Sequence, residues 1–454
     1  MPTSVNGQSG EGGLRAHLIK GASGSLAIQV GFAGLAFLNA LVLARWLGAG
    51  GYGAYAGAMA WVSLLLIPAV LGLDNLLVRD TAIFRSRQEW GKLKGLLRFS
   101  TGLVLATSIM AAGALAAIAH WGFADAAKAS LRHTMYVAAF LPPVLALATL
   151  AGSGLRGIER VILANLPGMI VRPALLLLAI LLVVWLWPNR LSAPAAMALN
   201  LGAAVVALVV GLVWVRKYLG PQIADAQPRY TARPWLAAAL PMLVYSGSQT
   251  VLGQTDMAML GAMRGTAETG IYAAANRLAY LLVFGMAATG VILAPVMARL
   301  HDAGDKARLQ RIVTKAARVS FLLVLPFGLA LIFFGPWFLG FFGEAFKGGE
   351  LVLAILAVGR LADVALGASA LLLTMTGHER LVAVTYVVAA AANVLLNALL
   401  IPSYGAVGAA IASIVCVISI KFLMWLFAYA RVGQDMSVLG LQPISWLTKR
   451  GGTA

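Results

Sequence analysis

Apolar segments long enough to cross a lipid bilayer recur along the whole chain, and they constrain its fold more than any other feature. A helix needs about 20 mainly apolar residues to span the bilayer core, and most of these segments reach that length. Only 11% of the residues are charged and 61% are hydrophobic, so lipid rather than water must be the main solvent. The segments are expected at residues 23–46, 53–76, 99–121, 133–154, 162–187, 193–215, 235–262, 270–297, 318–342, 350–376, 381–402 and 405–430.

The positive charges predict how these segments are oriented. The net charge is +18, from 34 Lys and Arg against 16 Asp and Glu, which in a soluble protein would suggest nucleic-acid binding. In a membrane protein, Lys and Arg concentrate in cytoplasmic loops. With a cytoplasmic N-terminus, 24 of them fall in inner segments and 6 in outer ones. This bias predicts about twelve crossings of a bacterial inner membrane, both termini in the cytoplasm, and no nucleic-acid partner.

The chain also divides into two similar halves. Gly53-Ala-Tyr55-Ala56 corresponds to Gly270-Ile-Tyr272-Ala273, and the segment 157–160 corresponds to 377–380 at nearly the same offset. Six crossings per half return the chain to the same side, so the repeat is parallel, with a pseudo-two-fold axis along the membrane normal. We therefore expect an all-α polytopic protein of two six-helix bundles. Its parts are a cytoplasmic tail at 1–22, a bundle at 23–217, a cytoplasmic linker at 218–234, a bundle at 235–430 and a cytoplasmic tail at 431–454.

Ionisable side chains inside the expected spans mark the candidate site, because charges at membrane depth are costly and usually face a cavity or a partner. They are Arg172, Arg277, Arg360 and Lys421, with Asp74, Asp256 and Asp363, and the polar neighbours Asn276 and Gln254. One hypothesis is a positive central cavity for an anionic head group such as pyrophosphate, since arginine pairs well with phosphate oxygens. The alternative is that Asp256–Arg277 and Arg360–Asp363 are neutralised pairs joining helices, while Lys421 reaches the cytoplasmic face.

No motif in the chain predicts catalysis or a bound metal. Residues 48–53 fit G-x-G-x-x-G, but they form a turn between two membrane helices rather than part of a βαβ unit. The phosphate-binding loop of ATPases is missing, and the five histidines lack ligand-like spacing. A single cysteine, Cys416, excludes a disulfide framework. We therefore expect no catalytic residue, no metal and no cofactor, and a transporter rather than an enzyme.

Four segments carry a resemblance to a known family. They are Ala44-Arg-Trp-Leu-Gly48 with Gly51-Tyr-Gly-x-Tyr55, residues 72–80, residues 256–278, and Asn397-Ala-Leu-Leu-Ile-Pro-x-Tyr-Gly-x-x-Gly-Ala-Ala-Ile-Ala412. They resemble the polysaccharide flippases (Wzx-type exporters of O-antigen and lipid-linked oligosaccharides) of the multidrug/oligosaccharidyl-lipid/polysaccharide superfamily. The resemblance implies alternating access and a polyprenyl-pyrophosphate-linked glycan, moved from the cytoplasmic to the periplasmic leaflet. Other implied partners are membrane lipids and further polysaccharide-assembly proteins.

The resemblance places Arg277 and Asp256 on the family's second-half motif, whereas Arg172, Arg360, Asp363 and Lys421 rest on membrane depth alone. Two alternatives from the same superfamily stay open: a cation-coupled multidrug exporter and a flippase for peptidoglycan lipid precursors. A membrane glycosyltransferase would need catalytic carboxylates or large outer loops, and the chain predicts neither. The identity of the glycan, and coupling to a proton or sodium gradient through Asp256 or Asp363, are left open.

Overall fold

The computed structural model of the protein describes residues 8–125, 128–187, 190–283, 293, 296–297, 299–300 and 302–440. Within these residues the secondary structure consists of helices joined by short turns. Helices suit a chain in lipid, because each satisfies its backbone hydrogen-bonding groups within one segment. Most of the expected span 270–297 beyond residue 283, and the tail from 441, lie outside the described residues.

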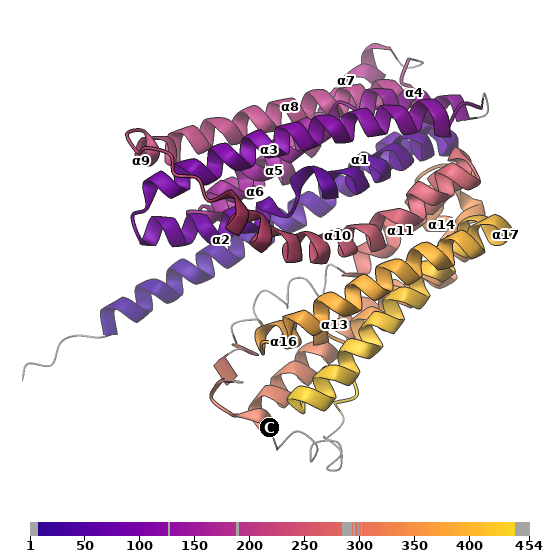
Figure 1. Cartoon of the computed structure of the whole chain (residues 1–454). Helices are drawn as coiled ribbons and strands as arrows, with labels where there is room; N and C mark the ends of the chain where they lie inside the picture. Colours follow the sequence, from indigo (N-terminus) through magenta and orange to yellow (C-terminus); the bar gives the residue numbers. More distant parts are fainter. Residues whose placement is uncertain are drawn as a thin grey trace, which may run out of the picture.

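The first half of the chain forms one bundle (Figure 1). Its helices are α1 (Gln8–Val70), α2 (Leu73–Ser86), α3 (Trp90–Ala117), α4 (Ala129–Ala138), α5 (Leu141–Gly157), α6 (Val161–Leu166), α7 (Arg172–Leu186) and α8 (Ala193–Tyr218), followed by the short α9 (Gly220–Ile223). A π-helix at Ile118–Gly122 extends α3, and another at Pro167–Val171 joins α6 to α7.

The second half forms the other bundle. Its helices are α10 (Ala232–Met263), α11 (Thr266–Tyr280), α13 (Lys306–Phe333), α14 (Gly335–Gly340), α15 (Glu350–Ala365), α16 (Ser369–Met375) and α17 (Glu379–Phe427). Short 3₁₀-helices at Leu281–Val283 and Glu344–Gly349 and a π-helix at Ala428–Val432 extend these elements. Figure 1 shows the bundles meeting near α11 and diverging towards the ends that carry α9 and α16.

Two glycines divide the longest helices into separate crossings. Gly48 in α1 has a φ of 66° and Gly405 in α17 a φ of 55°, values that glycine adopts without the steric cost of a Cβ. The apolar stretches around them are 44 and 54 residues long, about twice the ~20 residues that one crossing needs. Each stretch therefore crosses the membrane twice.

Six helices in the described part are long and apolar enough to cross a membrane, or eight if each of two bent pairs is one span. The second crossings in α1 and α17 add to these. The 32-residue α10 is also long enough, and α11 begins the span that continues beyond the described residues. The protein is thus an all-α polytopic membrane protein with about twelve transmembrane helices in two six-helix bundles, as the sequence predicts.

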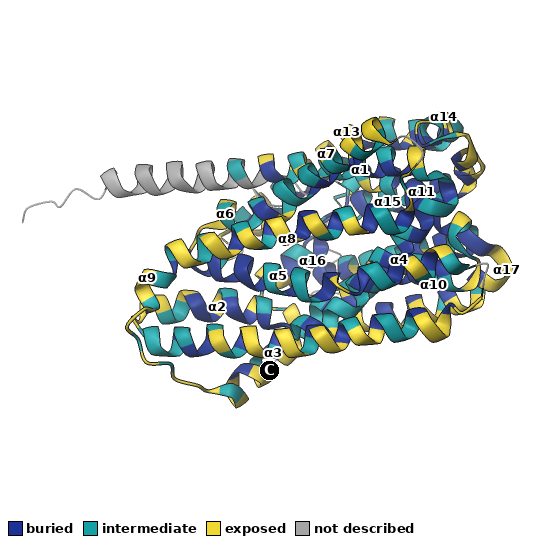
Figure 2. Ribbon diagram, turned by 90° about the horizontal axis from the view of Figure 1, so that it is seen from above, coloured by how far each residue is buried: buried dark blue, intermediate teal, exposed yellow. Residues whose placement is uncertain are grey.

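Large apolar side chains cover the outward faces of both bundles. Leu178, Leu323 and Val388 are 63%, 72% and 62% exposed, which is favourable only against lipid tails. In Figure 2 the buried residues lie between the helices, while exposed residues face outwards. Small residues such as Ala44 and Ala274 are fully buried, and they let neighbouring helices approach closely.

The two halves cross each other at equivalent points of the repeat. A Cβ on Gly53 in α1 would collide with the carbonyl oxygen of Thr266, and one on Gly270 in α11 would collide with that of Ala49. Thr266 and Gly270 stand 217 residues after Ala49 and Gly53. Each glycine therefore contacts the residue that corresponds, in the other half, to the residue its own counterpart contacts. This symmetry is what a two-fold axis between α1 and α11 requires.

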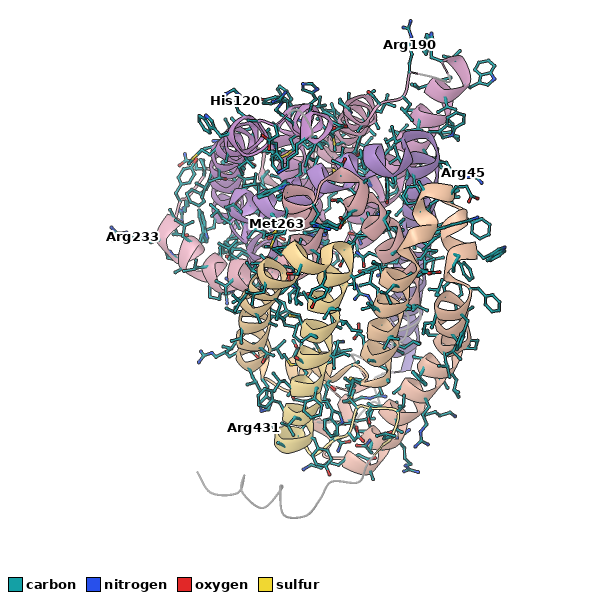
Figure 3. All side chains as sticks on the ribbon, turned by 90° about the vertical axis from the view of Figure 1, so that its right-hand side faces the viewer. Arg45, His120, Arg190, Arg233, Met263 and Arg431 are labelled. Carbon is teal, nitrogen blue, oxygen red and sulfur yellow. The ribbon has the colours of Figure 1, made fainter. Side chains whose placement is uncertain are left out.

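This crossing closes one end of the molecule. At the same end, Lys128 Nζ donates a hydrogen bond of 2.8 Å to the carbonyl oxygen of Ala262 in the other bundle. Arg45 and Arg190, which the charge pattern assigns to outer segments, lie at the rim of the end that faces the viewer in Figure 3. On the predicted topology, the bundles are therefore closed on the outer side.

We predict that Gly53→Ala will force the bundles apart at this end, because the new methyl group cannot fit against the backbone of Thr266. Helix shifts of this kind are on the order of 1–2 Å, and Gly53→Leu should produce a larger one. Spin labels at Arg190 and Met263, one in each bundle, would report longer distances by electron paramagnetic resonance.

The matched control for this prediction is Gly50→Ala, one turn away, where a Cβ would lie at an ordinary van der Waals distance of 3.7 Å from the Thr266 hydroxyl. This variant should keep the native distance distribution. If Gly53→Leu also keeps it, the crossing does not hold the outer end closed.

Candidate functional site

A central cavity of about 510 Å³ lies between the two bundles. Three arginines, Arg172 from α7, Arg277 from α11 and Arg360 from α15, line it together, and each is half-buried. The predicted polar residues Asn276 and Gln254 also line it. The other lining residues include Asn39, Tyr52, Tyr55, Ser63, Asn200 and Tyr280 with several apolar and glycine positions.

Arg172 is held by a break in its own span. The π-helix Pro167–Val171 ends immediately before it, and Pro173 follows, which cannot donate a backbone hydrogen bond. The guanidinium donates through Nε to Asn200 Oδ1 at 3.1 Å, and Asn39 Nδ2 donates to the carbonyl oxygen of Pro173 at 2.8 Å. These two asparagines fix the arginine and the irregular backbone that presents it.

The other two arginines lie against aromatic side chains. The Arg277 guanidinium lies beside the hydroxyl of Tyr52, a buried residue of α1 in the opposite bundle. Arg360 stacks over the ring of Tyr280, with 5.4 Å between the guanidinium carbon and the ring centroid. Aromatic contacts orient a guanidinium without neutralising its charge, so both arginines stay available to an anion.

Asp256 does not pair with Arg277. Its carboxylate accepts hydrogen bonds from Tyr272 Oη at 2.7 Å, Asn397 Nδ2 at 2.7 Å and Asn393 Nδ2 at 3.3 Å. The side chain is 4% exposed and lies within the second bundle, between α10, α11 and α17. Asp256 therefore forms hydrogen bonds with neutral donors of its own bundle and not the ion pair with Arg277 that the sequence suggests. Spacing along the chain cannot reveal these donors, because two of them come from the distant helix α17.

Asp363 pairs with Lys421 rather than with Arg360. The Nζ and Oδ1 atoms lie 2.7 Å apart, and the side chains are 16% and 8% exposed for Lys421 and Asp363. Neither Lys421 nor Asp363 is among the described residues that line the central cavity. The structure therefore places Lys421 away from the cavity for which the sequence predicts it. Arg360 is three residues from Asp363 on α15, but its guanidinium points to Tyr280 instead. The described lining of the central cavity thus contains three positive and no acidic side chains.

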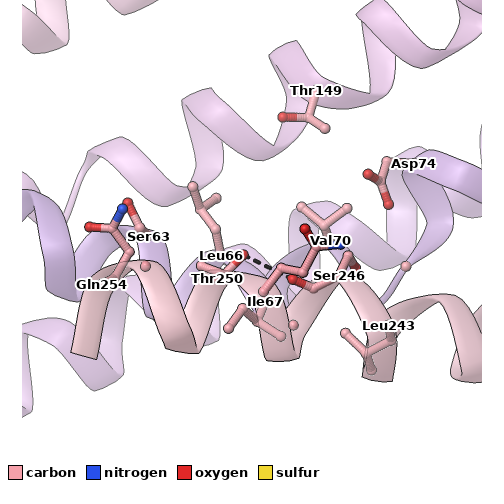
Figure 4. Close-up of a pocket in the computed structure, with 14 residues that line it drawn as sticks. Ser63, Leu66, Ile67, Val70, Asp74, Thr149, Leu243, Ser246, Thr250 and Gln254 are labelled. Carbon is pink, nitrogen blue, oxygen red and sulfur yellow. Dashed lines mark hydrogen bonds between the residues drawn. The ribbon is translucent and has the colours of Figure 1, made fainter. Parts of the chain in front are cut away.

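A second chamber of about 480 Å³ adjoins the central cavity (Figure 4). The two share Ser63, Gly253 and Gln254 as lining residues. Asp74, in the first turn of α2, lines the second chamber but not the first. The residues that line this chamber come from α1, α2, α5 and α10, on the side of the molecule away from the closed end.

Comparison with known families decides what kind of protein has this cavity. Residues 18–301, more than half of the chain, match the family described as "Polysaccharide biosynthesis protein". The chain belongs to this family. Residues 241–399 also match the MatE family model, and together the two matches confirm the superfamily expected from the sequence.

One curated relative of this polysaccharide biosynthesis protein is the "Probable low-salt glycan biosynthesis flippase Agl15" of Haloferax volcanii. It is 27% identical over 203 residues, 43% of this chain. The match spans 42% of the relative, so the chain covers less than half the length of that protein.

Solved structures share the fold at low sequence identity. An inward-facing multidrug transporter of the MATE family matches with a TM-score of 0.72 at 15% identity, covering 92% of this chain and 96% of that one. The lipid II flippase MurJ in an inward closed state matches with a TM-score of 0.66 at 12% identity, covering 88% and 87%. A superfamily transporter from Pyrococcus furiosus matches with a TM-score of 0.54 at 14% identity, covering 92% and 95%. At these identities the solved structures show a shared fold. The names printed for the curated relative and for the solved structures are those of flippases and transporters, in agreement with the expectation of a transporter rather than an enzyme.

Sequence reasoning missed the residues that hold the arginines in place. Asn200 is the only polar side chain of the apolar run 195–208, and this isolation is the signal that could have found it. In the sequence, Tyr52 and Tyr55 stand out only as residues of a motif, because their contact with the cavity depends on the turn at Gly48. Asn393 and Asn397 stand four residues apart, which places both amides on one helix face towards Asp256.

We predict that Asp363→Ala will destabilise the protein, because it leaves the Lys421 ammonium buried without its partner. Removing one member of a buried ion pair costs about 3–5 kcal/mol, which would appear as a lower melting temperature in detergent. Adding Lys421→Met to Asp363→Ala should restore much of the loss. Arg360→Ala should change the melting temperature little, and an equal loss there would mean that Arg360 is the true partner of Asp363.

Proposed function

We propose that the protein moves a polyprenyl-pyrophosphate-linked oligosaccharide from the cytoplasmic to the outer leaflet, by alternating access between its two bundles. The observation that carries the proposal is the convergence of Arg172, Arg277 and Arg360 on one cavity whose described lining has no acidic side chain. The description of the family and the printed name of the Haloferax volcanii relative support a role in glycan biosynthesis.

The charge of the cavity favours an anionic head group. Three half-buried guanidinium groups in a membrane protein are costly without counter-charge, and a diphosphate supplies that charge. Guanidinium groups donate paired hydrogen bonds that match phosphate oxygens. A cationic drug would instead meet three like charges, so the multidrug alternative fits this cavity less well.

The arrangement of the bundles favours movement of a lipid-linked substrate. The cavity lies between the two halves, so a polar head group can enter it while the polyprenyl tail stays in the surrounding lipid. Separation at Gly53 and Gly270, with closure at the opposite end, would then present the same arginines to the outer side. Because the arginines come from both bundles, one bound diphosphate can contact both halves during this exchange.

Membrane localisation is clear from the helices, and we propose the bacterial inner membrane with both termini in the cytoplasm, from the charge bias. Other polysaccharide-assembly proteins are proposed partners. Coupling to a proton or sodium gradient stays a hypothesis, and Asp256 and Asp363 are the acidic residues buried at membrane depth that would carry it.

The test is a flipping assay with purified protein in liposomes, following protection of a fluorescent polyprenyl-diphosphate sugar. We predict that Arg277→Ala will lower the initial rate about tenfold or more, because a hydrogen bond to a charged group contributes about 1.5–3 kcal/mol. Arg172→Ala and Arg360→Ala should act in the same direction.

The matched control is Arg311→Ala, which removes an exposed arginine of α13 that lies outside the cavity. It should keep the native rate. Native protein that leaves the lipid in place but moves a cationic dye against a proton or sodium gradient would replace this proposal with the multidrug alternative.

A further inference from the structure

The second chamber differs in chemistry from the cavity that holds the arginines. Its described lining has hydroxyl, amide and carboxylate side chains and no Lys or Arg. Figure 4 shows Ser63, Thr149, Asp74 and Gln254 around the chamber, which Leu66, Ile67, Val70 and Leu243 also line. A mixture of hydroxyl, amide and carboxylate groups is poorly suited to a diphosphate, so this chamber serves a different part of the substrate.

The hydroxyl groups of the chamber are set up as acceptors. Ser63, Thr149, Ser246 and Thr250 each donate their own O–H to the carbonyl oxygen four residues earlier, at 2.9, 2.8, 2.8 and 3.1 Å. The donor of each hydroxyl is therefore used within its helix, while its lone pairs remain for a ligand. Four acceptors in one chamber match a ligand that offers many O–H donors.

Asp74 adds the strongest acceptor. Its half-buried carboxylate lines the chamber, and Arg156 is close enough to interact with it electrostatically. The described residues give the Asp74 side chain neither a hydrogen bond nor an ion pair, so its oxygens can accept from two neighbouring hydroxyls of a ligand. A ligand carboxylate would be repelled at this position.

A glycine lies where the two chambers adjoin. Gly253 lines both chambers, and a Cβ built on it meets no atom within 4 Å. A larger side chain at this position would therefore enter the space between the lining residues without disturbing the packing of α10. Gln254 and Ser63 line both chambers as well, so a substrate whose head group binds the arginines could extend past these three residues into the second chamber.

We propose that the second chamber binds the sugars next to the diphosphate, and that it selects neutral or amino sugars over acidic ones there. The inference rests on the proposed function, since the arginines must hold the diphosphate. Hydroxyl groups of the first sugars donate to Ser63, Thr149, Ser246, Thr250 and Asp74, while the diphosphate stays with the arginines. The central cavity thus binds the diphosphate through hydrogen-bond donors, and the second chamber binds the sugars through hydrogen-bond acceptors.

The experiment compares two probes in liposomes: a polyprenyl diphosphate that carries an N-acetylhexosamine, and the same lipid diphosphate without a sugar. Gly253→Leu should lower the flipping rate of the sugar-bearing lipid about tenfold and that of the bare lipid about twofold at most. Thr250→Val, which removes an acceptor, should lower only the sugar-bearing rate, about three- to tenfold. Arg277→Ala should lower both rates.

Gly113→Leu is the matched control, because Gly113 is an exposed helical glycine of α3 with no atom within 4 Å of a built Cβ and lies outside both chambers. It should leave both rates at the native level. A third probe with a uronic acid as its first sugar should be moved poorly by native protein and better by Asp74→Asn, because the repelling charge is removed.

If Gly253→Leu and Thr250→Val lower the flipping rates of both lipids equally, the second chamber does not bind the sugars. Native flipping rates in both variants would overturn the proposal as well. In either case, loss of bare-lipid flipping in Arg277→Ala would leave the proposed function standing. If native protein moves neither lipid, the proposed function is wrong, and so is the proposal that the second chamber binds the sugars.

Discussion

The close crossing of α1 and α11 is the contact on which the arrangement of this protein depends. Gly53 and Gly270 let two backbones touch at the pseudo-two-fold axis, where any side chain would collide with a carbonyl oxygen. In lipid there is little hydrophobic force between apolar helices, so close van der Waals packing of small residues must hold the bundles together. Joining them at one end leaves the space between them free, and the arginine cavity and the second chamber occupy that space.

The buried charges divide into satisfied and unsatisfied groups. Asp256 accepts three hydrogen bonds and Asp363 has Lys421, so both carboxylates are compensated inside the second bundle. Among the described residues, Arg277 contacts the hydroxyl of Tyr52, Arg360 stacks on Tyr280, and Arg172 donates to the neutral amide of Asn200, so none of the three forms an ion pair there. A protein in lipid retains uncompensated charge at a cost, and the cost is offset when a ligand brings the opposite charge. The proposed anionic head group would supply this opposite charge while it occupies the cavity.

The shared fold does not decide what is carried. Transporters with the same architecture include a MATE family drug transporter and a lipid II flippase, each at 15% identity or less. Their common feature is two bundles around a central space, and the substrate depends on the side chains that line it. In this chain the lining combines three guanidinium groups with a neighbouring set of oxygen acceptors, which suits a head group that is anionic at one end and rich in hydroxyls at the other.

The length and apolarity of the segments determined that the chain spans a membrane and that it does so as helices. In lipid, a backbone must satisfy its hydrogen-bonding groups within the protein, and a helix does this within one segment. The repeat at Gly53 and Gly270 was likewise visible as a pattern along the chain, and Arg172, Arg277 and Arg360 were visible as charges at membrane depth. The pairing of the charges, in contrast, depended on the tertiary structure. Asp363 forms its ion pair with Lys421 on another helix and not with Arg360, which lies one turn away on the same helix. Spacing along a helix limits which partners are near, but side-chain rotation and the packing of distant helices decide which one is reached. For the same reason, the contact between Asn200 and Arg172 depends on the packing of α8 against α7, and the second chamber depends on how α1, α2, α5 and α10 come together.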